Sequence, residues 1–233
     1  MTALEIVLVS VSGALVALIV ALIIIVSVVN GYFTKKVVDY EVLNEFAPEN
    51  PIVFLGDSLT DLFPVHEFLP DERIINRGIS NETTFDVERR IDCVTALKPR
   101  TVFLLIGIND FLRLKKSTPK KVADRVVYLA DILSKTCNDI RVISLFPVNK
   151  KKRGVMSRFY LRKVNNLMIA ATNQLIKKGC LERGYSYLDF HSYLMDEHGD
   201  LNSDYTFEGL HLNLAGYKAL TPYYKRELQS IEH

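Results

Sequence analysis

The chain has few cysteines, almost no net charge and no internal repeat. Its only cysteines, Cys93, Cys137 and Cys180, are odd in number and far apart. This excludes a disulfide-dense scaffold and a zinc site of clustered thiolates. Lys and Arg total 29 against 27 Asp and Glu, for a net charge of +2, so bulk charge gives no support for nucleic-acid binding. Any basic function must be local.

Charged residues are also missing from residues 6–29 near the N-terminus. A helix of that length rises about 36 Å, enough to cross a hydrocarbon core of about 30 Å. A cleaved signal peptide is the alternative, but no Lys or Arg precedes the run and no small-x-small site follows it. We therefore predict that residues 1–30 are an uncleaved, single-pass transmembrane anchor that locates the protein at a membrane. The side on which the rest of the chain lies stays open, because Lys35 and Lys36 are thin evidence for orientation.

Residues 31–50 connect this apolar segment to the rest of the chain. Val38, Val42, Leu43 and Phe46 recur there at helical spacing. We predict a partly helical connector that packs on the following domain, with a loosely ordered linker as the alternative. The main domain is predicted to span residues 51–233, long enough to bury a core of its own.

From residue 51 onward, apolar runs that fit strands alternate with segments that fit amphipathic helices. The expected strands are 52–55, 73–76, 101–106, 140–145 and 185–189, and the expected helices are 84–97, 119–134, 160–178 and 213–228. Alternation of this kind predicts an α/β fold, with a mostly parallel sheet of about five strands between helices.

Polar residues follow the expected strands where the carboxyl ends of parallel strands would meet. Gly56-Asp57-Ser58-Leu59-Thr60 follows the first strand, although on its own it could be a turn that caps a helix. The other polar segments are Asn76-Arg77-Gly78 after the second strand, Gly107-Ile108-Asn109-Asp110 after the third, and Glu208-Gly209-Leu210-His211 before the last helix. Together they predict one site at this edge of the sheet.

These segments contain what ester cleavage by a serine needs. Ser58 is the predicted nucleophile and His211 the base that accepts its proton. Glu208, three residues earlier, would orient the imidazole. The backbone N–H groups of Ser58 and Gly78 and the side-chain amide of Asn109 would form an oxyanion hole.

The four segments resemble the signature blocks of the SGNH, or GDSL-type, esterase and lipase superfamily. Within it, the chain is most similar to the branch of the platelet-activating-factor acetylhydrolase catalytic subunits and bacterial lysophospholipase-like esterases. The resemblance covers about residues 51–228. It implies a flavodoxin-like three-layer α/β/α fold, no metal or organic cofactor, and Ser58, Gly78, Asn109 and His211 as the name-giving residues. The family usually has Asp three residues before the histidine, so Glu208 is a departure and Asp204 is an alternative partner for His211.

Basic residues follow the third and fourth expected strands, on the side that carries Ser58. They are Arg113, Lys115 and Lys116 in one cluster and Lys150, Lys151, Lys152 and Arg153 in the other. Such runs are often only solvated loop charges. The functional alternative is a positive rim, formed by Arg113, Lys150, Lys151 and Lys152 above all, that attracts an anionic substrate or lipid headgroups.

The sequence as a whole predicts a membrane-anchored serine esterase that acts through an acyl-enzyme on acyl or acetyl esters of a lipid or a cell-envelope glycan. An acyltransferase with the same site and a tethered binding module with a decayed site are the alternatives. The sequence contains nothing that indicates an oligomeric state.

Overall fold

The computed structural model describes residues 2–71 and 73–231, and within this range it leaves out the side chains of residues 3–9, 26 and 29–34. The chain divides into two compact units, Met1–Val42 and Leu43–His233. The first is helical and the second holds the sheet.

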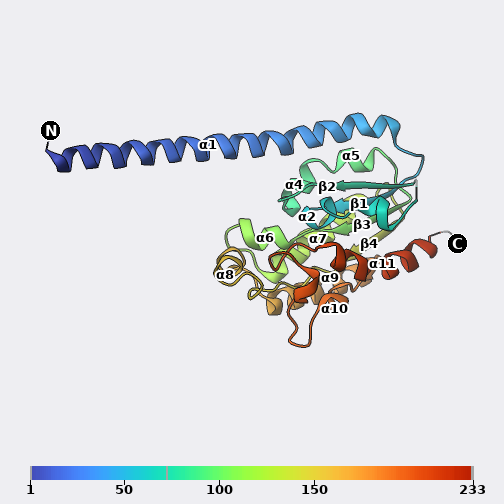
Figure 1. The fold of residues 1–233 in the computed structure, drawn as a ribbon. Coiled ribbons are helices and arrows are strands. Elements are labelled where there is room, and N and C mark those ends of the chain that lie inside the picture. The colour runs from blue at the N-terminus through green and yellow to red at the C-terminus, as the bar shows by residue number, and fades with distance from the viewer. Residues whose placement is uncertain (1, 72, 232–233) are drawn as a thin grey trace. The chain divides into compact units, whose positions relative to one another are not determined.

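The first unit is built on one continuous helix, α1 (Ala3–Leu43), seen in blue in Figure 1. The helix does not end at residue 30, where the predicted anchor ends, but continues through Lys35, Lys36, Asp39 and Glu41. No helix in the described residues is long and apolar enough to cross a membrane. The predicted span 6–29 falls partly on side chains outside the description. The transmembrane anchor is therefore not supported by the structure, and the membrane location stays a prediction.

The connector after α1 is held by a polar residue rather than by the apolar residues that were predicted to pack. The short 3-10 helix η1 (Asn44–Phe46) follows α1, and Leu43 and Phe46 are 50% and 80% exposed. Asn44 instead donates from Nδ2 to the carbonyl oxygen of Cys93 at 2.6 Å and accepts at Oδ1 from Arg77 Nη2 at 2.9 Å. Leu43 and Phe46 therefore do not contribute the apolar packing that their spacing predicts, and hydrogen bonds of Asn44 hold this segment instead. The packing of the connector 31–50 as a whole stays a prediction.

The second unit is built on a five-stranded sheet with the order β2-β1-β3-β4-β5 and every pairing parallel. The strands are β1 (Ile52–Gly56), β2 (Ile74–Gly78), β3 (Thr101–Leu105), β4 (Asp139–Ile143) and β5 (Ser186–Leu188). All residues of β1 and β3 are buried, as expected for central strands covered on both faces. The predicted parallel α/β sheet is confirmed.

Helices cover both faces of this sheet and complete the predicted three-layer arrangement (Figure 1). On one face, Tyr224 of α11 packs on Phe54 of β1, and Phe54 stacks on Phe103 of β3 with ring centroids 4.8 Å apart. On the other face α7 and α9 pack together, with Gly179 against Val127. The helices of this unit are α2 (Ser58–Asp61), α3 (Val65–Phe68), α4 (Thr84–Arg89), α5 (Asp92–Thr95), α6 (Ile108–Arg113), α7 (Pro119–Leu133), α8 (Val155–Tyr160), α9 (Asn166–Arg183), α10 (His191–Leu194) and α11 (Leu214–Gln229), with the 3-10 helix η2 (Ser203–Tyr205).

Two of the expected helices are interrupted. The one expected at 84–97 breaks between α4 and α5, where Arg90 leaves helical geometry and its buried guanidinium reaches the ends of β1 and β2. The one expected at 160–178 is replaced by α8 and α9, because the side chain of Asn165 caps a new helix by accepting from the N–H of Met168. Arg90 thus marks the end of one helix, and Asn165 marks the start of another.

Candidate active site

Ser58 lies where β1 ends and α2 begins. Asp57 is the N-cap of α2, and its Oδ1 accepts from the N–H of Leu59 at 3.0 Å. Gly56, the last residue of β1, has no space for a side chain, because a Cβ there would overlap the carbonyl oxygen of Leu105. The segment is thus a helix cap, as its composition allows. The capping residue is Asp57, which leaves the hydroxyl of Ser58 available for other contacts.

The structure brings Ser58, His211 and Glu208 into one hydrogen-bonded chain. Nε2 of His211 lies 2.8 Å from Oγ of Ser58, and Nδ1 of His211 lies 2.5 Å from Oε1 of Glu208. The same Oε1 accepts from the backbone N–H of His211 at 3.0 Å. With Nδ1–H donating to the carboxylate, Nε2 is the acceptor for the serine proton, as a general base must be.

Glu208, and not Asp204, is the carboxylate behind His211. Burial acts to raise the pKa of Glu208, but the hydrogen bonds from the ring and backbone of His211 outweigh it and hold this pKa below its usual range. Asp204 is exposed and is bonded through its backbone, its N–H donating to Asn202 Oδ1 and its carbonyl accepting from Asn213 Nδ2. The glutamate therefore stays ionised while it holds the imidazole.

The loop that carries Glu208 is fixed by its own polar contacts. Thr206 Oγ1 donates to the carbonyl oxygen of His211 at 2.7 Å and accepts from the N–H of Gly209 at 2.9 Å. Gly209 has a φ of +97° and accepts at its carbonyl from the N–H of Asn149, and a Cβ would overlap the Asn149 carbonyl. The hydroxyl of Ser157 on α8 donates to the carbonyl oxygen of Glu208 at 2.7 Å. These contacts set the backbone so that the longer glutamate side chain reaches Nδ1.

The predicted oxyanion donors lie at the ends of β1, β2 and β3. The N–H of Ser58, at the first residue of α2, is among the amides that a helix leaves without an intrahelical acceptor. Asn109 is buried and uses one N–H of its amide to donate to the carbonyl of Glu82 at 2.9 Å, which leaves its second N–H. The N–H of Gly78 donates to Asn76 Oδ1 at 2.8 Å. Of the three donors, Gly78 is thus engaged within its own strand end.

The need for glycine at position 78 comes from packing. A Cβ there would overlap the backbone of Asp61 in α2. The sequence-based reason was a close approach to substrate, whereas the structure shows a close approach of α2 itself.

A buried ion pair beneath the site has no counterpart in the sequence analysis. Both carboxylate oxygens of Glu82 accept from Nε of Arg90 at 2.9 Å, and Nη2 of Arg90 donates to the carbonyl of Arg77 at 2.9 Å. The carbonyl of Glu82 in turn holds Asn109. The pair thus ties the ends of β2 and β3 together. In the sequence, Glu82 precedes the expected helix 84–97 and Arg90 lies within it, and nothing in that pattern indicates that the two residues pair.

Asp57 is a buried carboxyl beside the nucleophile that is satisfied on one side only. Its Oδ2 has no hydrogen-bond partner among the residues that the structure describes. Burial, opposed by the bond from Leu59 and the charge of His211, raises the pKa of Asp57 to about 7. A buried carboxylate with an unpartnered oxygen is costly, so the folded protein takes up a proton here near neutral pH.

The raised pKa predicts that Asp57 makes the fold less stable as the pH rises. Its pKa in the unfolded chain is near 3.8, so between pH 4 and 7 the folded state binds more protons and stability falls with pH. The total loss is about 4 kcal/mol, complete above pH 8. Asp57→Asn keeps an N-cap acceptor but cannot ionise. We expect the free energy of unfolding of Asp57→Asn, measured in urea, to rise relative to that of the wild type as the pH increases from 4 to 8. The difference should grow by up to about 4 kcal/mol. A gap that stays constant across this range would contradict the prediction.

The predicted basic rim is partly neutralised by pairing. Arg113 bonds Asp86 Oδ2 at 3.1 Å, and Lys151 bonds Asp200 at 3.0 Å. Lys152 donates to the neutral carbonyl of Ser203, and Lys150 is half-buried. The role of these residues toward a substrate stays a prediction. Among the residues that the structure describes, no cluster of three or more His, Cys, Asp or Glu side chains could hold a metal ion.

The chain matches a known protein family. The model of the GDSL-like Lipase/Acylhydrolase family matches residues 54–219. Among curated proteins, the chain is 28% identical over 191 residues to an N-acylneuraminate cytidylyltransferase of Escherichia coli O18:K1:H7, covering 76% of this chain. The chain spans only 40% of the length of that relative.

Solved structures share the fold. One, described as a platelet activating factor from Streptococcus pneumoniae, has a TM-score of 0.78 at 24% identity over 90% of this chain and 98% of its own. A GDSL-like lipase from Bacteroides thetaiotaomicron has a TM-score of 0.71 at 21% identity over 84% and 97%. An acetylxylan esterase from Geobacillus stearothermophilus has 0.58 at 18% over 78% and 94%. With the family match over most of the second unit, the chain belongs to the GDSL-like lipase/acylhydrolase family and is a carboxylic ester hydrolase.

Proposed function

We propose that the protein is a serine esterase that works through an acyl-enzyme on Ser58. Oγ of Ser58 attacks the ester carbonyl carbon while Nε2 of His211 takes its proton. The tetrahedral intermediate collapses, His211 gives the proton to the leaving alcohol, and the acyl group stays on Ser58. Water then attacks this acyl-enzyme with the same histidine as base, which releases the acid and restores the hydroxyl.

The charge that develops on the carbonyl oxygen is met by donors already in place. We assign this role to the N–H of Ser58 and the second amide N–H of Asn109. The N–H of Gly78 joins them only when it gives up its bond to Asn76. Glu82 positions the amide of Asn109 through its carbonyl oxygen, and Arg90 holds Glu82 through the buried ion pair.

The observation that carries this proposal is the unbroken chain from Ser58 through His211 to Glu208, with distances of 2.8 and 2.5 Å. The binding-module alternative rested on the departure from Asp to Glu208, and it loses that support because Glu208 reaches the imidazole. The substrate class that we propose is an acyl or acetyl ester of a lipid or a glycan. The likeness to an acetylxylan esterase supports an acetylated glycan as one member of this class.

The direct test is labelling with a fluorophosphonate, which traps an activated serine. We expect the wild type to label with one equivalent and Ser58→Ala not to label. Ser192→Ala, a change at an exposed serine on α10, is the matched control and should label like the wild type. A wild type that stays unlabelled would refute an activated Ser58. Product analysis with an added alcohol would distinguish hydrolysis from acyl transfer, since both use the same base.

A further inference from the structure

Helix α8 presents almost all of its side chains to solvent, and most of them are apolar. Val155, Met156 and Phe159 are 81%, 71% and 68% exposed, and Tyr160 is also exposed. Phe207, one residue before Glu208, is exposed as well. We refer to these five residues as the α8 surface. Large apolar side chains gathered on one exposed element are characteristic of a contact surface.

The α8 surface is anchored to the candidate active site by one inward-facing residue. Ser157 is buried, donates to the carbonyl of Glu208 and accepts from the N–H of Arg153 at 3.0 Å. The guanidinium of Arg153 donates to the carbonyl of Phe207 at 3.1 Å. Whatever covers α8 therefore lies next to Ser58 and His211.

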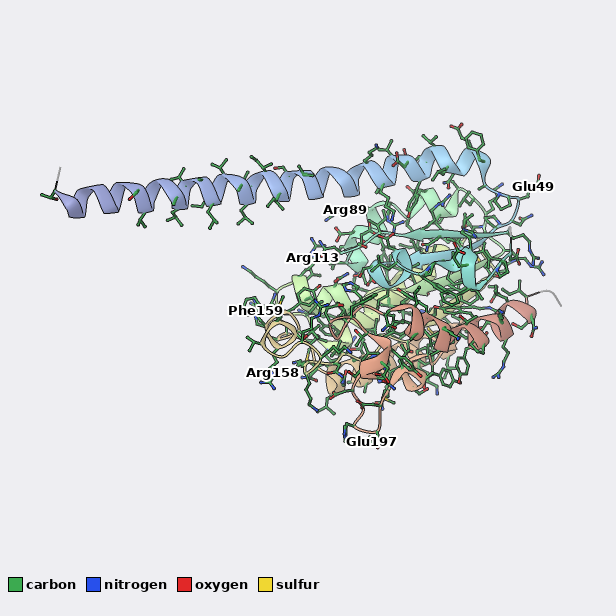
Figure 2. All side chains as sticks on the ribbon, in the orientation of Figure 1. Glu49, Arg89, Arg113, Arg158, Phe159 and Glu197 are labelled. Carbon is green, nitrogen blue, oxygen red and sulfur yellow. The ribbon has the colours of Figure 1, made fainter. Side chains whose placement is uncertain are left out.

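Basic residues surround the apolar ones, and residues 150–163 include no Asp or Glu. Lys151 is paired with Asp200. Lys152, Arg162 and Lys163 bond neutral oxygens, and the guanidinium of Arg162 also lies 4.3 Å from the ring centroid of Phe159, so these contacts leave their positive charge uncompensated. Arg153 donates to the carbonyl of Phe207, and its charge acts on the carboxylate of Glu208. Figure 2 shows Arg158 and Phe159 at the periphery of the second unit.

We propose that the α8 surface and its basic flanks dock the second unit on an anionic lipid bilayer, with the apolar side chains among the acyl chains and the basic ones at the headgroups. A positive border around an apolar centre matches the two layers of such a surface. Long basic side chains can keep their charge at headgroup level while their stems stay in apolar surroundings. The docking depends only on this surface. That a lipid ester would then be a substrate rests on the function proposed above.

The chain contains no tryptophan, so one introduced Trp reports on a single position. Phe159→Trp places it on the α8 surface. Leu181→Trp, at a residue of α9 that is 67% exposed, is the matched control. Both variants keep α1, so any contribution of α1 to vesicle binding is common to them. The probes are vesicles of brominated phosphatidylcholine, with and without phosphatidylglycerol, because bromine quenches a Trp that enters the acyl region.

We expect about twofold or greater quenching of the Trp at position 159 on vesicles that contain phosphatidylglycerol, and little on phosphatidylcholine alone. The Trp at position 181 should stay unquenched on both. Lys152→Glu with Arg158→Glu in the Phe159→Trp protein should remove the quenching. The inference is overturned if position 159 is not quenched, if both positions are quenched equally, or if the charge reversal changes nothing. Fluorophosphonate labelling of the same variants reports separately on the esterase site, so a failure of docking and a failure of the proposed chemistry can be distinguished.

Discussion

Ser58→Ala is expected to lower kcat for ester hydrolysis by roughly 10⁴- to 10⁶-fold. The substitution removes the oxygen that forms the acyl-enzyme in the proposed mechanism. It leaves the strand end, the Asp57 cap and the oxyanion donors in place, because these contacts use other atoms. Residual catalysis from binding and the oxyanion hole is roughly 10³- to 10⁴-fold over water in serine-protease precedent.

The measurement is the hydrolysis of a panel of nitrophenyl esters with short and long acyl chains. Ser192→Ala again provides the control for a serine-to-alanine change and should keep the wild-type rate. If Ser58→Ala retained activity within about tenfold of the wild type, another nucleophile would have to carry the reaction. The chain length at which the wild type is fastest would also narrow the substrate class.

The sheet could be predicted from the sequence because its strands are short apolar runs bounded by turn residues. The run 52–55 stands between Pro51 and Gly56, and β1 is found at Ile52–Gly56. Central strands of a parallel sheet are buried on both faces and need no alternation of polar residues. Their loops were therefore expected at one edge, and Ser58, Gly78, Asn109 and His211 are found there.

The helix boundaries could not be predicted in the same way. Leu161 and Val164 continue the apolar stripe of α9 in the sequence and are fully buried, yet they precede that helix, while Leu175 within it is 39% exposed. An apolar stripe records that residues are buried and not whether the backbone between them is helical. The break at Arg90 depends on Glu82 and on the ends of two strands, contacts that no local pattern contains.

The residues of the candidate site could be named from the sequence, but the hydrogen bonds that connect them could not. Which carboxylate faces His211 depends on a loop held by Thr206, Asn149 and Ser157, which come from separate parts of the chain. In the same way, the bond between Gly78 and Asn76 is invisible in the sequence, although it decides which donors are available to an oxyanion. Spacing identifies candidates, and long-range polar contacts then decide among them.

Glu208→Gln is expected to lower kcat by roughly 10²- to 10⁴-fold at neutral pH. Oε1 of Glu208 accepts from both Nδ1 and the backbone N–H of His211. A glutamine at this position can direct its amide N–H at Nδ1, which favours the tautomer of His211 that carries its proton on Nε2. In that tautomer Nε2 cannot accept the proton of Ser58. The charge that stabilises the imidazolium is lost as well. Since the low pKa keeps Glu208 ionised in mild acid, protonation of Glu208 should not cause an acid limb of the wild-type profile.

Asp204→Ala is the matched control, because the hydrogen bonds of Asp204 come from its backbone. It should keep the rate within a few fold of the wild type. Glu208→Asp tests the length of the side chain. The loop contacts of Gly209 and Ser157 hold the backbone at the distance that suits glutamate, so we expect the shorter acid to be slower than the wild type although it is the family's usual residue. If Asp204→Ala abolished activity while Glu208→Gln did not, Asp204 would be the orienting carboxylate and the loop would have to rearrange in the working enzyme.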